Sequence, residues 1–420
     1  MITNNQPVTN NYFCLHPTPY SLRTPQNIFF QVDEFGQDCV NIIGVRTQYS
    51  PLNSLRLGNW FKLICGASYQ HLPAVRNLTL AYTLAGADCI DVAADPAVIA
   101  AAQTGLAVAQ QWGTTAIEKG FHYTGQPLLM VSLNDGEDPH FRKAEFDSTA
   151  CPTDCWRPCE AICPAEAIAF SEVASGVIDA LCYGCGRCLP VCPSHLIGAR
   201  SYVSTPAMVA PLLLSNGVDA LEIHTQVGRE DDFKRLWQNV QPWVNRLKLI
   251  SISCPHHPDL IDYLLTLYEI LSPLPCDLIW QTDGRPMSGD IGAGTTQASI
   301  KLAQKVIAAN LPGFVQLAGG TNQSTVAKLR TLGLLPQQSA ARDESVSQSS
   351  RVGGVAYGSY ARTLLSPILE KLESMPIPVS TTIQPPEGVQ VVGTHHTQPD
   401  LLWKAVSLAH SLVSQLKGFS

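Results

Sequence analysis

The stretch at residues 218–253 reads VDALEIHTQVGREDDFKRLWQNVQPWVNRLKLISIS, and its pattern predicts the fold class. It begins with a short apolar run, continues with a plausible amphipathic helix at 229–244, and ends in a second apolar run at 247–253. Short apolar runs that alternate with helical stretches are typical of parallel strands joined by crossover helices. The stretch therefore predicts one strand–helix–strand unit of an α/β fold.

The same pattern recurs outside the cysteine-rich segment. Eight apolar runs, each followed by a plausible amphipathic helix, are FKLIC (61–65), DCIDVA (88–93), PLLMVSL (127–133), VDALEIH (218–224), LKLISIS (247–253), CDLIWQ (276–281), GFVQLA (313–318) and VGGVAYG (352–358). Eight such units over this length predict a closed TIM-type (β/α)8 barrel. A doubly wound open sheet is the alternative, and we prefer the barrel.

Length and composition limit the kind of protein. With 420 residues, 45% of them hydrophobic, the chain can bury a large core in about two to three domain-sized units. Its formal net charge of -7 opposes binding to nucleic acid, which needs a basic surface, so no nucleic-acid partner is expected. The chain shows neither an export signal nor an apolar stretch of the roughly 18 residues that a transmembrane helix needs. We therefore expect a cytoplasmic protein without a transmembrane segment.

Eight of the 14 cysteines fall into two short runs. Residues 151–164 read CPTDCWRPCEAICP, and residues 182–193 read CYGCGRCLPVCP. The second run has the complete ligand spacing of bacterial ferredoxins, C-x2-C-x2-C-x3-C-P. Three thiolates on a tight loop can cap three corners of a cubane, and Gly184 and Gly186 let the backbone curl around it. The two runs therefore predict iron–sulfur clusters.

The fourth thiolate of each cluster is expected to come from the other run, as in two-cluster ferredoxins. This crossed pairing predicts one cluster on Cys151, Cys155, Cys159 and Cys192, and a second cluster on Cys182, Cys185, Cys188 and Cys163. We expect two 4Fe-4S clusters, although the first two gaps of the first run are one residue wider than usual, which leaves a 3Fe-4S cluster open there. Zinc sites and disulfides are less favoured, because zinc ribbons space cysteines as two distant pairs and disulfides need an oxidising compartment.

The cysteine segment is expected to be an insertion in the barrel. Between the two runs, residues 165–181 predict a β-hairpin that turns at Ser175 and Gly176. The segment falls between the third strand and its expected helix at 205–217, so the clusters should lie near the barrel mouth, where loops after strands open. The predicted domains are an N-terminal extension with a hairpin around Gly36 (1–57), the first part of the barrel (58–134), an inserted ferredoxin-like 4Fe-4S domain (135–200), the rest of the barrel (201–373), and a C-terminal extension with a helix (374–420).

Glycine-rich loops at the expected barrel mouth could bind the phosphate of a flavin. Gly319 and Gly320 follow the seventh strand, and Gly358 and Ser359 follow the eighth, where many barrels offer backbone N–H groups to a phosphate. Arg285, in the polar loop after the sixth strand, could clamp a small anion. Turn geometry alone also explains the glycines, so flavin binding is a hypothesis.

Other polar residues are also expected to point toward the mouth without forming a recognisable catalytic set: Lys62, Asn134, Asp135 and His140.

Several long stretches resemble the light-dependent period protein family of cyanobacteria. They are GNWFKLICGASYQHLPAVRNLTLAYTLAGADCIDVAAD, VSLNDGEDPHFRKAEFD, the two cysteine runs, TDGRPMSGDIGAGTT and LAGGTNQST, so the resemblance spans nearly the whole chain. The resemblance implies an iron–sulfur protein that feeds the redox state of the cell, and so light, into the circadian clock. It also implies that the partners are clock input proteins.

Three functions remain open on the sequence. The first is a redox sensor without turnover, in which the oxidation state of the clusters biases a partner-binding surface. The second is a flavin and iron–sulfur oxidoreductase with its active site at the barrel mouth. The third is an electron-transfer or accessory subunit of a photosynthetic complex.

Overall fold

The computed structural model describes residues 31–32, 38–39, 50–171, 175–201, 217–285, 292, 294–336, 351–373 and 399–418. The chain divides into two units, residues 1–48 and residues 49–420. In the first unit, strands β1 (Gln31–Val32) and β2 (Asp38–Cys39) pair antiparallel, as a hairpin requires, while Gly36, where the turn is predicted, lies outside the described residues.

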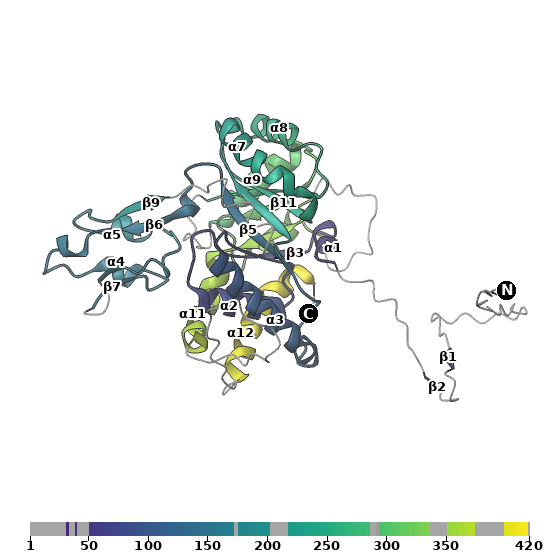
Figure 1. The fold of residues 1–420 in the computed structure, drawn as a ribbon, viewed down its shortest axis with the longest axis horizontal. Helices are drawn as coiled ribbons and strands as arrows, with labels where there is room; N and C mark the ends of the chain where they lie inside the picture. Colours follow the sequence, from purple (N-terminus) through teal and green to yellow (C-terminus); the bar gives the residue numbers. More distant parts are fainter. Residues whose placement is uncertain are drawn as a thin grey trace, which may run out of the picture. The chain divides into compact units, whose positions relative to one another are not determined.

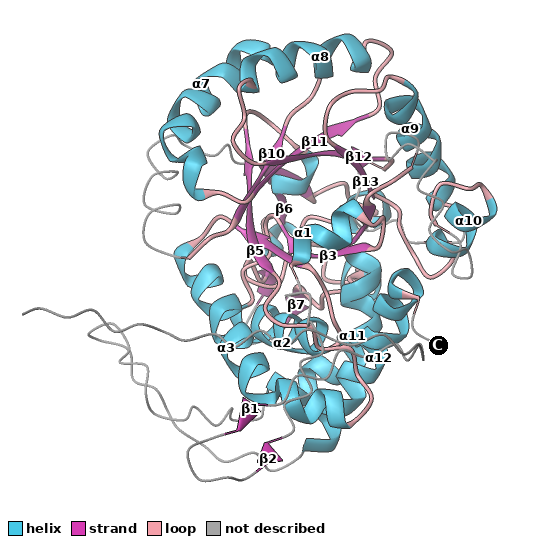
Figure 2. Ribbon diagram, turned by 90° about the vertical axis from the view of Figure 1, so that its right-hand side faces the viewer, coloured by secondary structure: helices cyan, strands magenta, loops and turns pink. Residues whose placement is uncertain are grey.

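The second unit contains a closed barrel of eight parallel strands. In order around the barrel they are β3 (Trp60–Gly66), β4 (Cys89–Ala93), β5 (Leu128–Asn134), β10 (Ala220–His224), β11 (Leu249–Pro255), β12 (Asp277–Asp283), β13 (Phe314–Ala318) and β14 (Gly354–Tyr357). The last strand pairs with the first, with Ala356 opposite Lys62, so the open-sheet alternative is wrong. All eight strands lie where the sequence predicts them, and Figure 2 shows them as a ring surrounded by helices.

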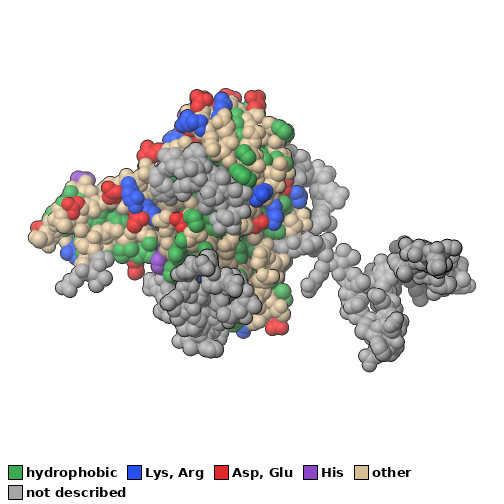
Figure 3. All heavy atoms as spheres, viewed as in Figure 1, with side chains coloured by type: hydrophobic (Ala, Val, Ile, Leu, Met, Phe, Trp, Pro, Cys, Tyr) green, Lys and Arg blue, Asp and Glu red, His purple; other side chains and the backbone are tan. Residues whose placement is uncertain are grey.

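The helices that follow the strands cover the outside of the barrel because each has one apolar face. In α7 (Glu230–Val240), the residues Phe233, Leu236, Trp237 and Val240 are buried, which is the spacing of one helical face. The outer face of α7 carries paired charges such as Arg235 with Asp232, and Figure 3 shows acidic and basic side chains mixed on this part of the surface. The remaining helices of the outer layer are α2 (Leu72–Leu84), α3 (Pro96–Glu118), α8 (Leu260–Leu271), α9 (Thr296–Ala308), α10 (Thr325–Thr331) and α11 (Ser359–Glu373). The helix predicted at 205–217 lies, except for residue 217, outside the described residues.

Two further helices complete the packing around the barrel. Helix α1 (Pro51–Arg56) lies at the amino-terminal end of the strands, where Leu55 joins the apolar layer that contains Trp60. Helix α12 (Pro399–Lys417) packs on the outside against α2 and α11, as predicted for the C-terminal helix. Its last residue, Lys417, places Nζ 2.6 Å from both carboxylate oxygens of the fully buried Asp88. Among the described residues, none of the helices has the length and hydropathy needed to cross a membrane.

The interior of the barrel changes from apolar to polar along the strands. Near the amino-terminal ends, Trp60, Met130 and Ile279 belong to one buried apolar layer. Residues two apart on a strand point to the same face, so the residues two positions further along these strands also point into the barrel. There the side chains are polar. These buried polar residues are Lys62, Asp91, Ser132, Glu222, Ser251, Gln281 and Gln316. The carboxyl half of the barrel therefore holds a polar site.

The cysteine segment is an insertion after β5 with its own small apolar core (Figure 1). Strand β6 (Arg142–Glu145) pairs antiparallel with β9 (Gly198–Ser201), and β7 (Ile168–Phe170) pairs antiparallel with β8 (Ser175–Val177). Two short helices, α4 (Pro158–Ile162) and α5 (Cys188–Val191), carry cysteines.

The hairpin predicted between the cysteine runs is confirmed, but its turn is misplaced in the prediction. Ser175 and Gly176 pair with Phe170 and Ala169 inside strand β8, so the chain reverses before Ser175. Gly176 has φ +107, which a glycine adopts without strain, so here the residue belongs to a strand rather than to the turn.

Candidate metal centres and the barrel mouth

One set of four cysteines surrounds a cavity in the insertion. Cys163, Cys182, Cys185 and Cys188 line it together with apolar side chains that include Ile168. The tight loop before α5 passes under the start of β6, where a Cβ on Gly184 would overlap the carbonyl oxygen of Arg142. Gly184 also has φ +72, a backbone conformation that favours glycine. Both the missing side chain and the backbone conformation of Gly184 are thus needed to bring the three cysteines of this loop around the cavity.

The sulfur atoms of this set accept hydrogen bonds from the backbone. The N–H of Ala144 in β6 donates to Cys182 Sγ at 3.3 Å, and the N–H of Ala167 donates to Cys163 Sγ at 3.2 Å. Burial raises the pKa of Cys188 to about 12, and the neighbouring thiols of Cys185, Cys182 and Cys163 add to the rise. Mutually close thiols resist losing their protons together unless a cation compensates the charge, and a metal cluster supplies that compensation.

The second set of cysteines is Cys151, Cys155, Cys159 and Cys192. Burial raises the pKa of Cys159, and the nearby thiols of Cys192 and Cys151 raise it further. The pKa of Cys151 is likewise raised by loss of hydration and by the thiols of Cys155 and Cys192. Burial opposes ionisation of Cys192, but backbone N–H groups from Ser194 to Ile197 outweigh it and lower the pKa of this thiol.

The structure therefore brings Cys163 beside the first three cysteines of the second run, and it brings Cys192 near Cys151 and Cys159 of the first run. This is the grouping that the crossed pairing requires, while the ligand assignment itself stays a prediction. The residues present fit iron–sulfur clusters, because thiols in groups of four, backbone N–H groups aimed at sulfur and an apolar cover are what such clusters need.

Lys62 lies at the centre of the polar half of the barrel. Its side chain is fully buried and forms ion pairs with Glu222 and, at 3.3 Å, with Asp91. Burial by itself lowers the pKa of Lys62, but the carboxylates of Asp91 and Glu222 outweigh it and raise that pKa above its usual value. Gln281 and Ser251 complete the hydrogen bonding, with Ser251 Oγ donating to Glu222 Oε2 at 2.8 Å and Gln281 Oε1 accepting from Lys62 at 3.0 Å.

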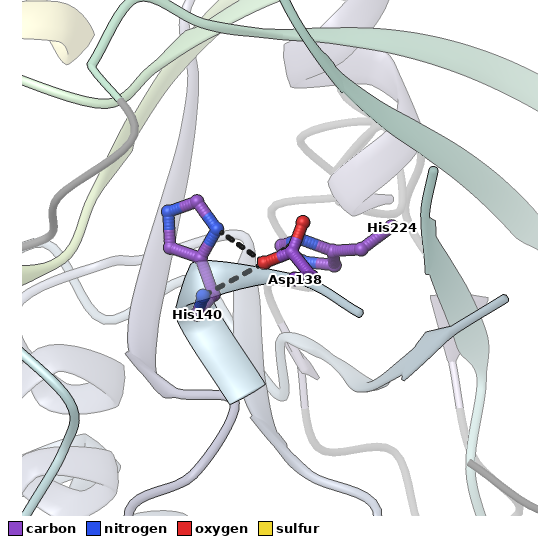
Figure 4. A group of neighbouring side chains, drawn as sticks. All are labelled: Asp138, His140 and His224. Carbon is purple, nitrogen blue, oxygen red and sulfur yellow. Dashed lines mark hydrogen bonds and ion pairs between the residues drawn. The ribbon is translucent and has the colours of Figure 1, made fainter. Parts of the chain in front are cut away.

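Two histidines and an aspartate meet above this network (Figure 4). Asp138 Oδ1 lies 2.9 Å from His140 Nδ1 and 3.8 Å from His224 Nδ1, and His224 Nε2 lies 3.0 Å from Glu222 Oε1. Burial lowers the pKa of His224, but the hydrogen bond to Glu222 and the charge of Asp138 raise it to about 9. The sequence analysis predicted His140 at the mouth but missed Asp138 and His224. Asp138 follows β5 and His224 ends β10, and a position at the carboxyl end of a barrel strand is the signal that marks mouth residues.

Four of the five residues predicted to bind a flavin phosphate lie at the barrel mouth. Gly319, Gly320, Gly358 and Ser359 line the mouth cavity with His140, His224 and Asp283, whereas Arg285 does not line it. Close backbone packing accounts for the first two glycines, because a Cβ on Gly319 would lie 2.9 Å from the backbone nitrogens of Gly284 and Arg285, and one on Gly320 would lie 3.0 Å from the carbonyl oxygen of Thr295. Flavin binding stays a hypothesis.

Tyr183 connects the insertion to the barrel mouth. It follows Cys182 and lines both the cysteine cavity and the mouth cavity. Its ring lies edge-on to Tyr69 at 6.0 Å between centroids and beneath the guanidinium of Arg362 at 4.2 Å. Arg362 in turn donates to the carbonyl oxygens of Ile64 and Cys65 at 2.9 and 3.1 Å. The cysteine set around Cys182 therefore lies beside the mouth of the barrel.

Comparisons with known proteins identify relatives of both parts of the chain. Residues 151–203 match the LdpA Fe-S cluster-binding domain, and residues 212–415 match the light dependent period A C-terminal domain. A curated relative from Synechococcus elongatus, "Light dependent period A", is 50% identical over 369 residues, covering 87% of this chain and 94% of the relative. Among solved structures, tryptophan synthase from M. tuberculosis aligns with 78% of this chain and 96% of its own at 14% identity and a TM-score of 0.34, a similarity that has no bearing on function.

Proposed function

The chain belongs to the light dependent period A family and is an iron–sulfur protein of light-dependent period control, and we propose that it acts as a redox sensor. In this proposal two 4Fe-4S clusters report the redox state of the cell, and so light, to the circadian clock. The observation that supports the proposal is the convergence of Cys163, Cys182, Cys185 and Cys188 around one cavity, which lies beside the barrel mouth through Tyr183.

A bound cluster would supply one-electron chemistry, so its reduction would add one negative charge to the group that the four thiolates hold. The residues around the Cys182 set can respond to that charge. The N–H groups of Ala144 and Ala167 already donate to sulfur and would stabilise the added charge. Arg362, stacked on Tyr183, would be attracted more strongly to a reduced cluster at this site.

The contacts between the insertion and the barrel can transmit this response. Lys143 in β6 donates to Gln70 Oε1 of the barrel at 2.8 Å and to Asp179 Oδ2 of the insertion at 2.9 Å. Together with the Tyr183 and Arg362 contact, it connects the cysteine loop to the end of β3 and the start of α11. Two oxidation states would then favour two arrangements of this junction, which is the physical requirement for a switch.

A protein partner would bind differently to the two arrangements at the surface, and the family suggests clock input proteins as such partners. Trp156, next to Cys155, is 75% exposed, and an exposed tryptophan beside a redox centre suits a docking contact.

Hydrogen exchange of the anaerobic holoprotein in its oxidised and reduced states tests the sensor. We expect reduction to slow amide exchange in peptides covering residues 64–71 and 359–363, because the junction tightens, while a peptide covering α7 stays unchanged. The variant Tyr183→Leu should lose most of this difference at unchanged iron content, whereas Tyr268→Leu on α8 should keep it. Exchange differences confined to residues 151–201 would rule out transmission to the barrel.

The mouth cavity favours a second function, a flavin and iron–sulfur oxidoreductase. The specific observation is that Gly319, Gly320, Gly358 and Ser359 line a cavity that also contains buried histidines and carboxylates. Acid extraction of the anaerobic protein decides between the two functions. Stoichiometric flavin would favour the enzyme, and two clusters without flavin would favour the sensor.

A further inference from the structure

The side chains of Asp138, His140 and His224 converge at the barrel mouth in a way that neither iron–sulfur cluster explains (Figure 4). We propose that these three residues form a binding site for a divalent transition-metal ion of the Zn2+ type. The site is separate from the eight cysteines of the two runs, since it is built from the connection after β5 and from the last residue of β10.

The distances suit a shared ion. The ligand atoms of the three residues all lie within 4.8 Å of one another, and Asp138 Oδ1 lies 2.9 Å and 3.8 Å from the Nδ1 atoms of His140 and His224. Ligands about 2.0–2.1 Å from a tetrahedral zinc stand roughly 3.3 Å apart. The observed separations lie on both sides of this value, so small side-chain movements suffice.

The donor types select the class of metal. Two imidazoles and one carboxylate form a set used by catalytic zinc sites and by non-haem iron sites, both of which leave positions open. Calcium and magnesium prefer oxygen ligands alone, so they fit this set poorly.

A second shell already orients His224. Its Nε2 lies 3.0 Å from Glu222 Oε1, which leaves Nδ1 facing Asp138. Glu222 is itself fixed by Lys62, by Ser251 and by Gln281, whose Nε2 donates to Oε1 at 2.8 Å. A carboxylate behind a metal-binding histidine fixes the tautomer and the ring orientation, as this arrangement does.

The open side of the site faces the mouth cavity. His140 and His224 line this cavity with Asp283, a buried carboxylate at the end of β12 that can supply a further oxygen ligand. A hydrogen-bonded Asp–His pair alone would account for the contact between Asp138 and His140, whose backbone N–H also donates to Asp138 Oδ1 at 2.7 Å. That pair does not account for the second imidazole, His224, which comes from β10 and lies beside the same carboxylate oxygen of Asp138.

Zinc binding to the full chain tests the proposal. The protein is purified without oxygen so that its iron–sulfur clusters stay intact, loaded with Zn2+ and desalted. We expect one zinc per chain, and zinc X-ray absorption should show nitrogen and oxygen ligands at about 2.0–2.1 Å without the sulfur shell at about 2.3 Å that cysteine ligands give.

Variants separate this site from others. His140→Asn, at a side chain that is 18% exposed, should weaken zinc binding at least about 10-fold, and Asp138→Asn should do the same, both with unchanged iron and sulfide content. His257→Asn, at an exposed histidine 46% accessible, should bind zinc like the unaltered protein. Absence of retained zinc in the unaltered protein, a zinc–sulfur shell, or equal zinc affinity in His140→Asn would each overturn the proposal and leave a hydrogen-bonded cluster.

Discussion

Lys62 balances the charge of the barrel interior. It is fully buried between Glu222 and Asp91, so removing its charge leaves two buried carboxylates without their cation. We predict that Lys62→Met lowers the free energy of unfolding by about 3–5 kcal/mol, as expected when one partner of a buried ion pair is removed. Urea unfolding followed by circular dichroism measures the change.

The matched control is Lys248→Met, because Lys248 pairs with Asp219 at the surface with a side chain that is 58% exposed. A surface ion pair contributes less than about 1 kcal/mol, so this variant should unfold nearly like the unaltered protein. Equal effects of the two substitutions would mean that Lys62 does not hold the interior network together.

Asp135 gives the protein a pH dependence of stability. Its side chain is buried with Arg229 3.7 Å away, and burial raises the pKa of Asp135 to about 7 despite that arginine. A carboxyl group whose pKa is raised by folding stabilises the fold below its unfolded pKa of about 4, and this contribution is lost as pH rises through about 7. Asp135→Asn should therefore raise the free energy of unfolding by about 2–4 kcal/mol at pH 8, with a gain that shrinks toward pH 5.

Urea unfolding at pH 5, 6.5 and 8 measures this dependence for both proteins. Asp231→Asn, at a side chain that is 90% exposed, serves as the control and should show no such trend. A gain from Asp135→Asn that is constant across the range would contradict the raised pKa of Asp135.

Some site residues could be predicted from the sequence and others could not. The cysteine groups could be predicted because each run places three thiols on one local loop with a known spacing. Asp138, Glu222 and His224 could not be found in this way, because Asp138 follows β5 whereas Glu222 and His224 lie on β10, and no local sequence pattern links Asp138 to the two β10 residues. The pairing of β10 with β5 brings them together.

The loop from Cys182 to Cys188 depends on glycine at one position. A Cβ on Gly184 would overlap the Arg142 carbonyl oxygen, and the residue has φ +72. We predict that Gly184→Ala displaces the loop from β6 and loses about half of the iron, that of the cluster near Tyr183. Iron analysis after anaerobic purification measures the loss.

Gly228→Ala controls for backbone strain alone, because Gly228 has φ +90 but no atom within 4 Å of the added Cβ. It should keep its full iron content at a stability cost of about 1 kcal/mol. Full iron in Gly184→Ala would show that the contact with Arg142 is not needed for cluster binding.

Secondary structure could be predicted well where the pattern is long and periodic. All eight barrel strands are short apolar runs, and the structure places each of them within the predicted stretch or a residue or two beyond it. The turn of the cysteine hairpin was misplaced because Ser175 and Gly176 have turn-forming composition, whereas the pairing of β7 with β8 decides their conformation.

The crossed pairing predicted for the two cysteine runs would link both runs through each cluster. If Cys163 serves the cluster of the second run, the double variant Cys163→Ser with Cys188→Ser damages one cluster and keeps about half of the iron. The double variant Cys163→Ser with Cys151→Ser then damages both clusters and keeps little iron. Uncrossed pairing predicts the reverse order, so iron analysis of these two proteins distinguishes the assignments.

The proposed redox function requires iron and inorganic sulfide bound by the eight cysteines of the two runs. Elemental and sulfide analysis of the full chain, purified without oxygen, measures this most directly. We predict about eight irons and about eight sulfides per chain in a brown protein whose reduced form gives the electron paramagnetic resonance signal of 4Fe-4S clusters. A colourless protein that holds zinc on sulfur ligands, or no metal at the cysteines, would contradict the account.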